Sequence, residues 1–209
     1  MSADRLVLLQ KTAGDVSRET VERLIEFEQQ FCRWSARINL AAPSQIGQLW
    51  ERHILDSAQL VRFAPETTKW LDLGSGGGFP GAVVAILLHE RASFHIDLVE
   101  SNRKKAAFLK TALSAYENAA VHPMRIEQAY LIVKPPEIVT ARALAPLSDL
   151  LGLAAPWLTT GACGLFHKGR DYLSEIEEAR DAWRFDLVEH RSMVDREGRI
   201  LEIRNLGAR

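Results

Sequence analysis

The sequence reads Leu71-Asp72-Leu73-Gly74-Ser75-Gly76-Gly77-Gly78-Phe79-Pro80-Gly81 at the point where an apolar strand is followed by an apolar helix. The strand begins at Trp70 and ends at the first glycine, and the helix is expected over residues 79–89. Glycines in such a turn let the backbone bend sharply and approach a ligand without a Cβ in the way. The segment therefore predicts a strand, a ligand-binding loop and a helix in succession.

Two acidic residues stand beside this loop. Asp72 lies directly before it, where a carboxylate orders the turn or reaches toward the amino group of a cofactor. Glu100 ends a second apolar strand over residues 94–99, and it lies 26 residues after Gly74. A carboxylate at this position accepts hydrogen bonds from both hydroxyls of an adenosine ribose. The loop and Glu100 together predict the edge of a nucleoside-binding site.

The spacing of the glycines bears on the kind of nucleoside. The dinucleotide pattern G-x-G-x-x-G fails when it starts at Gly74, because its sixth position is Phe79. It matches when it starts at Gly76, but this register begins two residues late. The spacing therefore disfavours a dinucleotide and leaves a nicotinamide-dependent oxidoreductase as an alternative. A glycine turn without any ligand is disfavoured, because its glycines carry a large entropic cost.

Strands and helices alternate along the next hundred or so residues. Apolar runs predict strands at residues 94–99, 120–126, 138–141 and 162–167, and helices at residues 103–116, 148–155 and 172–183. Such alternation implies a parallel sheet covered by helices on both of its faces.

The C-terminus has a different pattern. Residues 185–194 and 199–206 are extended runs joined through Arg196-Glu197-Gly198, which predicts a hairpin and one strand antiparallel to the others. We therefore expect an α/β fold with a seven-stranded, mostly parallel sheet and an antiparallel C-terminal hairpin strand. This is the Rossmann-like arrangement of class I methyltransferases, whereas an NAD-binding Rossmann domain usually lacks the final hairpin.

Residues 1–62 predict an N-terminal helical extension to a single methyltransferase domain of residues 63–209. Ser17 is placed to cap a helix whose apolar residues recur at helical spacing as far as Trp34. Pro43-Ser44 is placed to start a third helix. Since Trp34 falls on an apolar stripe, we expect it in the core and not at a base-stacking surface.

The composition is that of a globular protein. Of the 209 residues, 47% are hydrophobic and 25% are charged, and the apolar run at residues 82–88 is too short to span a bilayer. The first residues lack the features of a secretory signal, and Cys32 and Cys163 have no disulfide or metal-ligand spacing. We expect a cytoplasmic protein without a metal site or a membrane partner. The net charge of −1 means that binding to nucleic acid would need a local basic patch.

The glycine loop, with its ending Gly78-Phe79-Pro80-Gly81, resembles the cofactor loop of the RsmG family, once called glucose-inhibited division protein B. Other segments agree with this family in order and spacing between about residue 25 and about residue 170. They are Asn39-Leu40, His53-Ile54-Leu55-Asp56-Ser57, Arg103-Lys104-Lys105 with Phe108-Leu109, Arg142-Ala143 and Lys168-Gly169. The resemblance implies methylation of a guanine N7 in small-subunit 16S ribosomal RNA, with S-adenosylmethionine as cofactor and S-adenosylhomocysteine as product. We expect a monomer that acts on the RNA within the small subunit or an assembly intermediate.

The resemblance also implies which residues hold the cofactor. Ile126-Glu127 would flank the adenine and Arg142 would line the site. The family commonly has Asp at the end of the second strand, where this chain has Glu100. The longer carboxylate keeps the same chemistry, so Glu100 keeps the ribose role. In the loop itself, the contacts implied are Gly74, Gly76, Gly78 and Phe79.

Methylation of guanine N7 places few demands on the protein. The atom has a free lone pair and loses no proton, so the transfer needs positioning in line with the sulfonium and no general base. Arg142 can donate a hydrogen bond to the cofactor, to the RNA backbone or to guanine O6, the acceptor beside N7. The alternative is that Arg142 forms only a surface salt bridge. Lys168 is a further candidate, because it lies at the carboxyl end of the fifth strand as Arg142 does on the fourth. His53 is a candidate only because of the resemblance. Cys32 and Cys163 are expected in the core, and not as nucleophiles.

A run without acidic residues supplies the local positive charge. Residues 101–110 hold four cations, and further arginines lie on the predicted N-terminal helices. Each phosphate that such cations neutralise adds salt-dependent affinity for RNA. A solvated helix face is the alternative, and a non-catalytic adenosine sensor or RNA-binding module remains a third hypothesis for the whole chain. The candidate RNA-binding residues are Arg103, Lys104, Lys105, Lys110, Arg33, Arg37 and Arg52.

Overall fold

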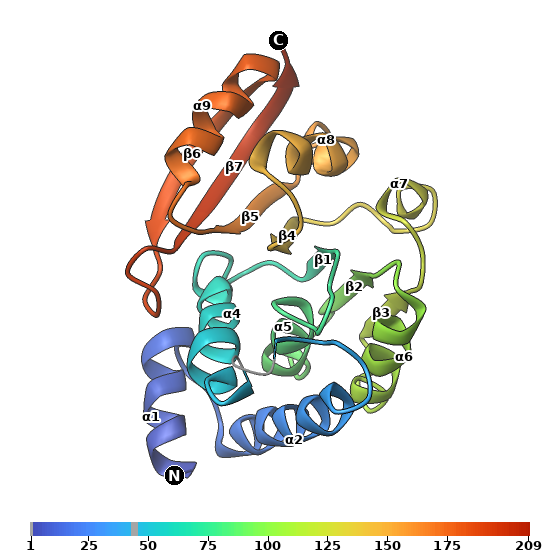
Figure 1. Cartoon of the computed structure of the whole chain (residues 1–209), viewed down its shortest axis with the longest axis vertical. Helices are drawn as coiled ribbons and strands as arrows, with labels where there is room; N and C mark the ends of the chain where they lie inside the picture. Colours follow the sequence, from blue (N-terminus) through green and yellow to red (C-terminus); the bar gives the residue numbers. More distant parts are fainter. Residues whose placement is uncertain (1, 43–45) are drawn as a thin grey trace.

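A seven-stranded sheet forms the centre of the protein in a computed structural model that describes residues 2–42 and 46–209 (Figure 1). The strands are β1 (Lys69–Leu73), β2 (His95–Val99), β3 (Ala119–His122), β4 (Ile138–Arg142), β5 (Cys163–Lys168), β6 (Trp183–Arg191) and β7 (Arg199–Ala208). They lie in the order β3-β2-β1-β4-β5-β7-β6. Strands β1 to β5 pair in parallel, whereas β7 pairs antiparallel with both β5 and β6. The predicted mostly parallel sheet with an antiparallel hairpin strand is confirmed.

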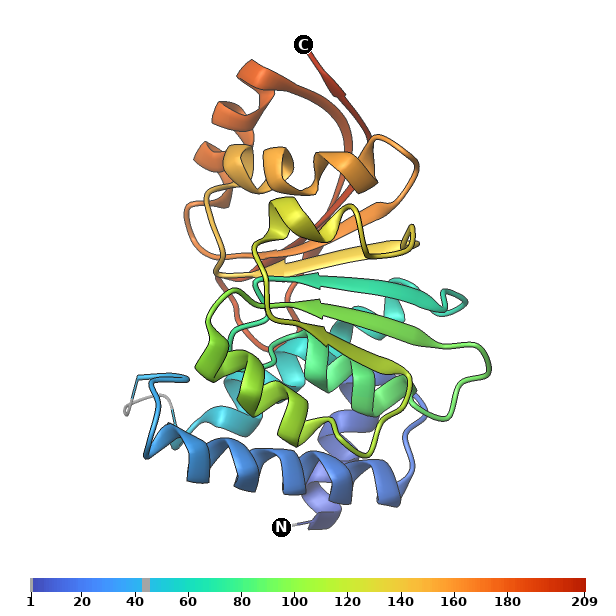
Figure 2. The same cartoon turned by 90° about the vertical axis from the view of Figure 1, so that its right-hand side faces the viewer.

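Helices cover both faces of this sheet, as the view along its edge shows (Figure 2). The helices are α1 (Ser2–Ala13), α2 (Arg18–Ser35), η1 (Trp50–Leu55), α4 (Asp56–Ala58), η2 (Gln59–Arg62), α5 (Gly81–Leu88), α6 (Arg103–Ala112), α7 (Ile126–Ala129), α8 (Leu147–Leu158) and α9 (Tyr172–Ala182). Elements η1, α4 and η2 form one continuous helical segment that begins with π-helical turns and ends in a 3₁₀ turn. The cap at Ser17 is confirmed, because its hydroxyl accepts from the Thr20 N–H at 3.1 Å. The helix start predicted at Pro43-Ser44 lies outside the described residues.

Several predicted boundaries were wrong: the helix expected over residues 103–116 ends at Ala112, and the strand expected over residues 185–194 is Trp183–Arg191. The third strand was expected to run to Ile126, but it ends at His122, and Ile126 instead begins α7. Pro123 follows His122 and has no N–H to donate to a strand ladder, which accounts for the early end. The helix after the glycine loop begins at Gly81 and not at Phe79, so the loop is two residues longer than expected.

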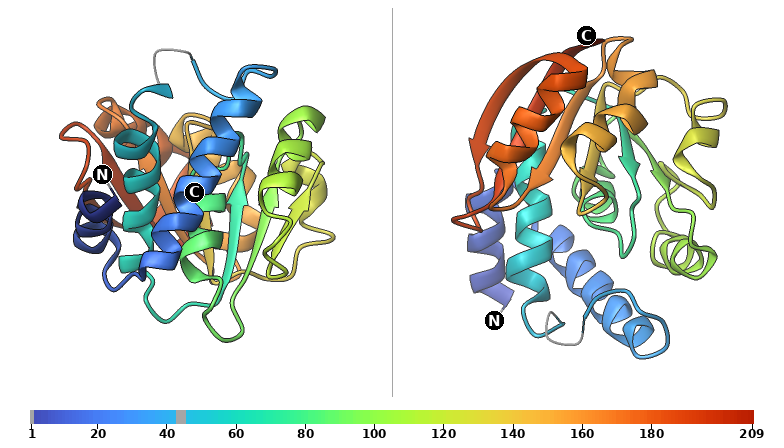
Figure 3. Two further views of the ribbon diagram at one scale, coloured as in Figure 1. Left: turned by 90° about the horizontal axis from the view of Figure 1, so that it is seen from below. Right: turned by 45° about the horizontal axis from the view of Figure 1, so that its top comes forward.

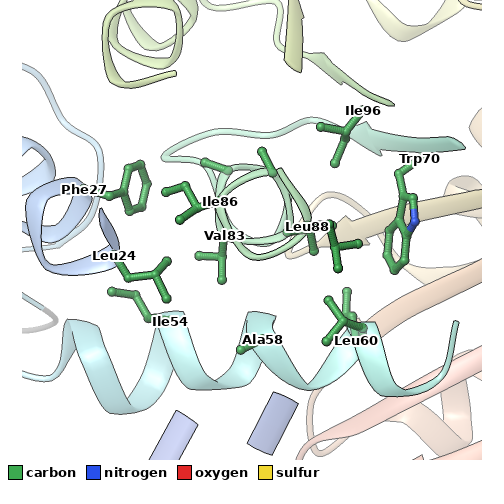
Figure 4. Close-up of a cluster of buried hydrophobic side chains, with 14 of the residues drawn as sticks. Leu24, Phe27, Ile54, Ala58, Leu60, Trp70, Val83, Ile86, Leu88 and Ile96 are labelled. Atoms are coloured by element: carbon green, nitrogen blue, oxygen red, sulfur yellow. The ribbon is translucent and has the colours of Figure 1, made fainter. Parts of the chain in front are cut away.

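The two faces of the sheet bury two separate hydrophobic clusters, because successive side chains of a strand point to opposite sides. Trp70 and Ile96 point to the face covered by α5, α6 and the N-terminal helices. Leu71 and Val139 point to the face covered by α8 and α9. Figure 4 shows the first cluster, in which Val83 of α5 lies between the sheet and the N-terminal helices.

The N-terminal helices belong to the same core as the sheet. Leu24 and Phe27 of α2 and Ile54 of η1 are buried in one cluster with the residues of α5 (Figure 4). Helix α2 lies across α5 and α6, as the view from below shows (Figure 3). The division into an extension of residues 1–62 and a domain of residues 63–209 stays an interpretation of the sequence, and the described parts of both share one core.

Candidate active site

A cavity of about 520 Å³ opens at the carboxyl ends of β1, β2 and β4. Such a position, beside the glycine loop of a doubly wound sheet, is where ligands bind in this class of fold. We refer to it as the first cavity. Its lining residues are Leu40, His53, Gly74, Ser75, Gly76, Gly77, Phe79, Val99, Glu100, Ser101, Lys105, Met124, Arg125, Ile126, Glu127, Arg142, Ala143, Leu144 and Leu153.

Most of the residues predicted to hold a cofactor meet in the first cavity. The glycine loop forms one wall, Glu100 a second, and Ile126 with Glu127 a third. Arg142 lies where β4 ends. These residues are far apart in the sequence, and the parallel order of the strands brings them to one edge.

The glycines of the loop divide into two kinds. Gly74 and Gly76 have φ values of +64° and +55°. Both line the first cavity, and since they have no side chain they line it with backbone atoms. Gly78 also has a positive φ of +94°, but it does not line the cavity. A Cβ on Gly78 would lie 2.8 Å from Ala82 Cβ and 3.0 Å from Phe27 Cζ. The lack of a Cβ on Gly78 lets α2 and α5 pack against the loop, and the cofactor contact predicted for this residue stays a prediction.

Phe79 connects the loop to the N-terminal helices. Its ring centroid lies 5.7 Å from that of Phe27 and 5.4 Å from that of Phe31, both on α2. On the η1 side it lies 5.1 Å from the ring of His53. A Cβ on Gly77 would also lie 2.6 Å from Phe31. Helix α2 thus supports the back of the loop, a role that the sequence pattern did not indicate.

Asp72 lies beneath the loop and does not line the first cavity. Its Oδ1 accepts from the Thr140 hydroxyl at 2.7 Å, and its Oδ2 accepts from the Gly81 N–H at 3.2 Å. Complete burial raises the pKa of Asp72 to about 6, although these hydrogen bonds and that of Ser75 oppose the shift. Of the two roles considered for Asp72, the geometry fits the ordering of the turn and not a contact with a cofactor.

Glu100 faces the first cavity and is held by two backbone groups. Its Oε2 accepts from the Gly76 N–H at 2.7 Å, and its Oε1 accepts from the Asn102 N–H at 2.6 Å. The side chain is buried, so its direction is fixed before any ligand arrives. Each carboxylate oxygen keeps a second lone pair, which is available to a ligand hydroxyl.

His53 lines the first cavity and lies close to Arg142. Burial lowers the pKa of His53 to about 4, and the positive charge of Arg142 acts in the same direction while Asp56 opposes it. His53 is therefore neutral near pH 7, unlike an exposed histidine, which is partly charged there.

Arg142 is held from the side of η1 and α4. Its Nη2 donates to the Arg52 carbonyl oxygen at 3.1 Å, and its Nε lies 3.6 Å from Asp56 Oδ2. The remaining nitrogen, Nη1, is buried and has no hydrogen-bond partner among the described residues. Burial lowers the pKa of Arg142, against the charges of Asp56 and Asp195. Leaving a buried donor unpaired is costly, so Nη1 is a donor for which a ligand acceptor would be favourable.

A second cavity of about 420 Å³ lies on the other side of β4 and shares Arg142, Ala143 and Leu144 with the first. Lys168 lines this second cavity and not the first. Its Nζ donates to Glu175 Oε2 at 2.5 Å and to the Ala145 carbonyl oxygen at 2.7 Å. Lys168 therefore ties β5 to α9 and does not reach the first cavity. The other lining residues are Asp56, Pro146, His167, Gly169, Ser192, Asp195, Gly198 and Arg199.

Three residues of the second cavity were not identified from the sequence. His167 is buried, and its Nε2 donates to the Asp56 carbonyl oxygen at 2.9 Å. Ser192 donates from its hydroxyl to Asp56 Oδ1 at 3.1 Å. Asp195 lies three residues later in the turn between β6 and β7. Asp56 stood in the string quoted for the resemblance, but the C-terminal residues carried no motif that could have found them.

The cations predicted as one RNA-binding patch are distributed around α6, because successive helical residues point about 100° apart. Lys105 lines the first cavity. Lys104 lines a hollow of about 1020 Å³ between α2 and α6, together with Arg33 and Arg37. The remaining cations of α6, Arg103 and Lys110, line another hollow. Arg52 is exposed on η1 beside Arg142.

Two further observations concern metal ligands and membrane-spanning helices. No group of three or more potential metal-ligating side chains occurs in residues 2–42 and 46–209. None of the helices in the described parts of the chain combines the length and apolar character that a bilayer crossing requires.

Comparisons with known proteins agree with this geometry. A family model described as rRNA small subunit methyltransferase G matches residues 20–204. The chain is 61% identical over 207 residues to ribosomal RNA small subunit methyltransferase G of Chelativorans sp. (strain BNC1). The aligned region covers 99% of each of the two chains.

Two solved structures have the same fold at low sequence identity. Cofactor-bound Rv0187 from MTB has a TM-score of 0.61 at 12% identity, over 94% of this chain and 93% of that one. An O-methyltransferase from Bacillus cereus in complex with SAH has a TM-score of 0.58, also at 12% identity, over 85% and 90% of the two chains. The class I methyltransferase fold expected from the strand count is therefore confirmed.

Proposed function

The chain belongs to the rRNA small subunit methyltransferase G family and is an S-adenosylmethionine-dependent rRNA methyltransferase, and we propose that its acceptor atom is N7 of a guanine in 16S ribosomal RNA. The first cavity, where a glycine loop and a fixed carboxylate meet across the ends of β1 and β2, carries the cofactor part of this account, and the acceptor is the one that the resemblance to the RsmG family implies. A nicotinamide-dependent oxidoreductase and a non-catalytic binding module are not favoured, because the family is one of methyltransferases.

The residues of the first cavity fit S-adenosylmethionine. The free lone pairs of Glu100 suit the two ribose hydroxyls. Ile126 offers an apolar face for the adenine ring, and the neighbouring Glu127 can accept from its amino group. The backbone of Gly74 and Gly76 faces the remaining length of the cavity, where an amino acid moiety would lie. The cavity of about 520 Å³ falls in the usual range for cofactor sites, about 300–1,000 Å³.

The proposed acceptor suits a site without a general base. When bound, the cofactor supplies a methyl group that is activated by an adjacent sulfonium. The lone pair of guanine N7 forms the new bond to this methyl as the bond from carbon to sulfur breaks, and the sulfur keeps that electron pair. The products are S-adenosylhomocysteine and a methylated guanine that now carries the positive charge, and no proton leaves. The task of the protein is therefore to align the two reactants.

The charge of the site suits a reaction between a cation and a neutral base. His53 is neutral near pH 7, because burial and Arg142 lower its pKa to about 4. It adds no positive charge beside a sulfonium or a methylated guanine. We therefore assign His53 to shaping the cavity with Phe79, which its ring contacts.

The cations around α6 and α2 are proposed to bind the RNA backbone. The hollow between α2 and α6 presents Arg33, Arg37 and Lys104, which suit phosphates. Lys105 lies at the mouth of the first cavity and would guide the RNA toward the cofactor. A local surface of this kind reconciles RNA binding with a net charge of −1. The substrate proposed is the 16S RNA of a small subunit or an assembly intermediate, bound by a cytoplasmic monomer.

The proposal is tested by methyl transfer to small ribosomal subunits that lack the modification, with labelled S-adenosylmethionine and mapping of the methylated base. We expect the label at N7 of one guanine of 16S RNA. Label at another atom, or none when the cofactor is bound, would contradict the proposed acceptor. Free 16S RNA in a parallel reaction distinguishes naked RNA from an assembled subunit as the substrate.

A further inference from the structure

The second cavity adjoins the end of the first cavity where methyl transfer must take place. The adenosine part of the cofactor is assigned to Glu100, Ile126 and Glu127, on the β2 and β3 side of the first cavity. The sulfonium end then lies on the opposite side, at Arg142, Ala143 and Leu144. These three residues form the boundary with the second cavity. An acceptor that approaches the methyl group in line with sulfur therefore comes from the second cavity.

Most charged groups in the second cavity already have partners. Lys168 and Glu175 pair with each other, and Arg199 donates to two backbone carbonyl groups and lies over the ring of Tyr172. Asp56 is held by Gln59 and Ser192.

Three groups that line the second cavity keep free hydrogen-bonding capacity, namely Arg142, Asp195 and His167, whose buried Nδ1 has no partner among the described residues. Nη1 of Arg142 is a donor without a partner among the described residues. Asp195 accepts only from the Glu197 N–H, through Oδ1 at 3.0 Å, and its Oδ2 has no partner in the described parts of the chain. The second cavity thus offers one donor at its boundary with the first cavity and one anionic acceptor on its outer side.

The turn that carries Asp195 is fixed to the helical segment across the cavity. The Met193 N–H donates to Gln59 Oε1 at 2.9 Å, and Ser192 donates to Asp56 Oδ1 at 3.1 Å. The Ser192 hydroxyl in turn accepts from the Asp195 N–H at 3.0 Å. Asp195 is therefore exposed but held in place, as a recognition residue needs to be.

We propose that the second cavity binds the base of the target guanine, with Arg142 donating to O6 and Asp195 accepting from N1–H and the 2-amino group. This inference rests on the proposed function and assigns the residues that select the base. It places N7, next to O6, at the boundary where the methyl group lies.

The order of these two groups selects guanine over the other purine. The substituent beside N7 meets Arg142, because Arg142 lies on the boundary between the cavities. In guanine this substituent is O6, an acceptor, whereas in adenine it is an amino group that would face a guanidinium donor. The next edge of guanine carries N1–H and the 2-amino group, both donors, which suit the Asp195 carboxylate. Adenine has neither donor there.

The inference is tested by the substitution Asp195→Asn, with Glu197→Gln as the matched control on the same turn. Asparagine keeps the Oδ1 that holds the turn and replaces the free anionic oxygen by an amide donor. Glu197 is exposed, pairs with Arg170 and does not line the cavity. We expect D195N to lower kcat/KM for unmodified small subunits about 10- to 100-fold, because the free acceptor oxygen for the base is replaced by an amide donor. E197Q should stay within about twofold of the wild type, and both should bind S-adenosylhomocysteine normally.

A second arm changes the RNA, and its wild-type reactions do not depend on how the variant folds. Subunits are reconstituted with 16S RNA that carries inosine, which lacks the 2-amino group, at the methylated position. The wild type should prefer guanosine to inosine about tenfold, and D195N should lose most of this preference. Equal rates of the wild type on the two substrates, or an unchanged D195N, would overturn the base assignment while the proposed function stands. Absence of any N7 methylation by the wild type would overturn both.

Discussion

The two cavities on either side of β4 are built in different ways. The first is built around one contiguous glycine loop, to which the ends of other strands bring side chains such as Glu100 and Ile126. The second uses side chains from four separate places, Asp56, Arg142, His167 and the turn at residues 192–198. A site made by consecutive backbone groups leaves a motif in the sequence. A site made by scattered side chains leaves none, although it is the one proposed to select the substrate.

The largest change in the free energy of unfolding is expected at Gly78, where the glycine loop is most tightly packed. Gly78→Ala combines a φ of +94° with a Cβ 2.8 Å from Ala82, so it should lower the free energy of unfolding by about 3 kcal/mol. Gly76→Ala has a φ of +55°, but its Cβ would make only an ordinary contact, 3.7 Å from the Gly74 oxygen, and it should cost about 1 kcal/mol. Denaturant unfolding of the two variants measures the difference. Equal losses would mean that the two glycines do not differ in the way proposed.

The second effect concerns Asp72 and the pH dependence of stability. Its folded pKa, about 6, lies above its usual value of 3.8, so the folded state binds more protons between these values. Stability contributed by protonated Asp72 is therefore present below about pH 4 and lost as pH rises through 6. Relative to Asp72→Asn, the wild type should lose about 2–3 kcal/mol of unfolding free energy between pH 4 and pH 7. Parallel curves for the two proteins would show that Asp72 has an ordinary pKa.

The third effect separates Glu100 from Asp72, the two acids at neighbouring strand ends. Glu100→Ala should weaken binding of S-adenosylhomocysteine by about 1–3 kcal/mol, because it removes the ribose acceptor and leaves two backbone N–H groups unpaired. Calorimetry measures the affinity, and Glu117→Ala, at an exposed acid far from the cavity, is the control. Unchanged affinity of the Glu100 variant would remove the ribose role.

The smallest effect is expected on the basic surface. Arg33→Ala combined with Lys104→Ala should weaken RNA binding and reduce the slope of log K against log salt by about 1 to 2, roughly one unit for each phosphate that is no longer neutralised. Affinity for S-adenosylhomocysteine should not change. Lys69→Ala, at the amino end of β1 on the opposite edge of the sheet, is the control. A slope equal to that of the control would exclude the hollow between α2 and α6 from the RNA interface.

The sequence was sufficient for most of the fold and for the cofactor half of the site. The mostly parallel sheet, the C-terminal hairpin and the positions of Glu100 and Arg142 followed from periodicity and from the rule that parallel strands present their carboxyl ends together, whereas the order of the strands was not predicted. It did not show that Gly78 lies outside the first cavity or that Lys168 lies in the second, because agreement with a motif does not show which way a residue faces. The second cavity was beyond prediction, because Asp56 and Asp195 meet only through the packing of the last hairpin on the N-terminal helices.

The central claim is that the cofactor lies across the first cavity with its reactive end toward the second. A crystal structure of the protein with S-adenosylhomocysteine tests it most directly. We predict the ribose hydroxyls on Glu100, the adenine beside Ile126, and the sulfur beside Leu144 at the boundary of the two cavities. Homocysteine at Ile126 and adenine at Leu144, or a ligand bound outside the first cavity, would contradict the account.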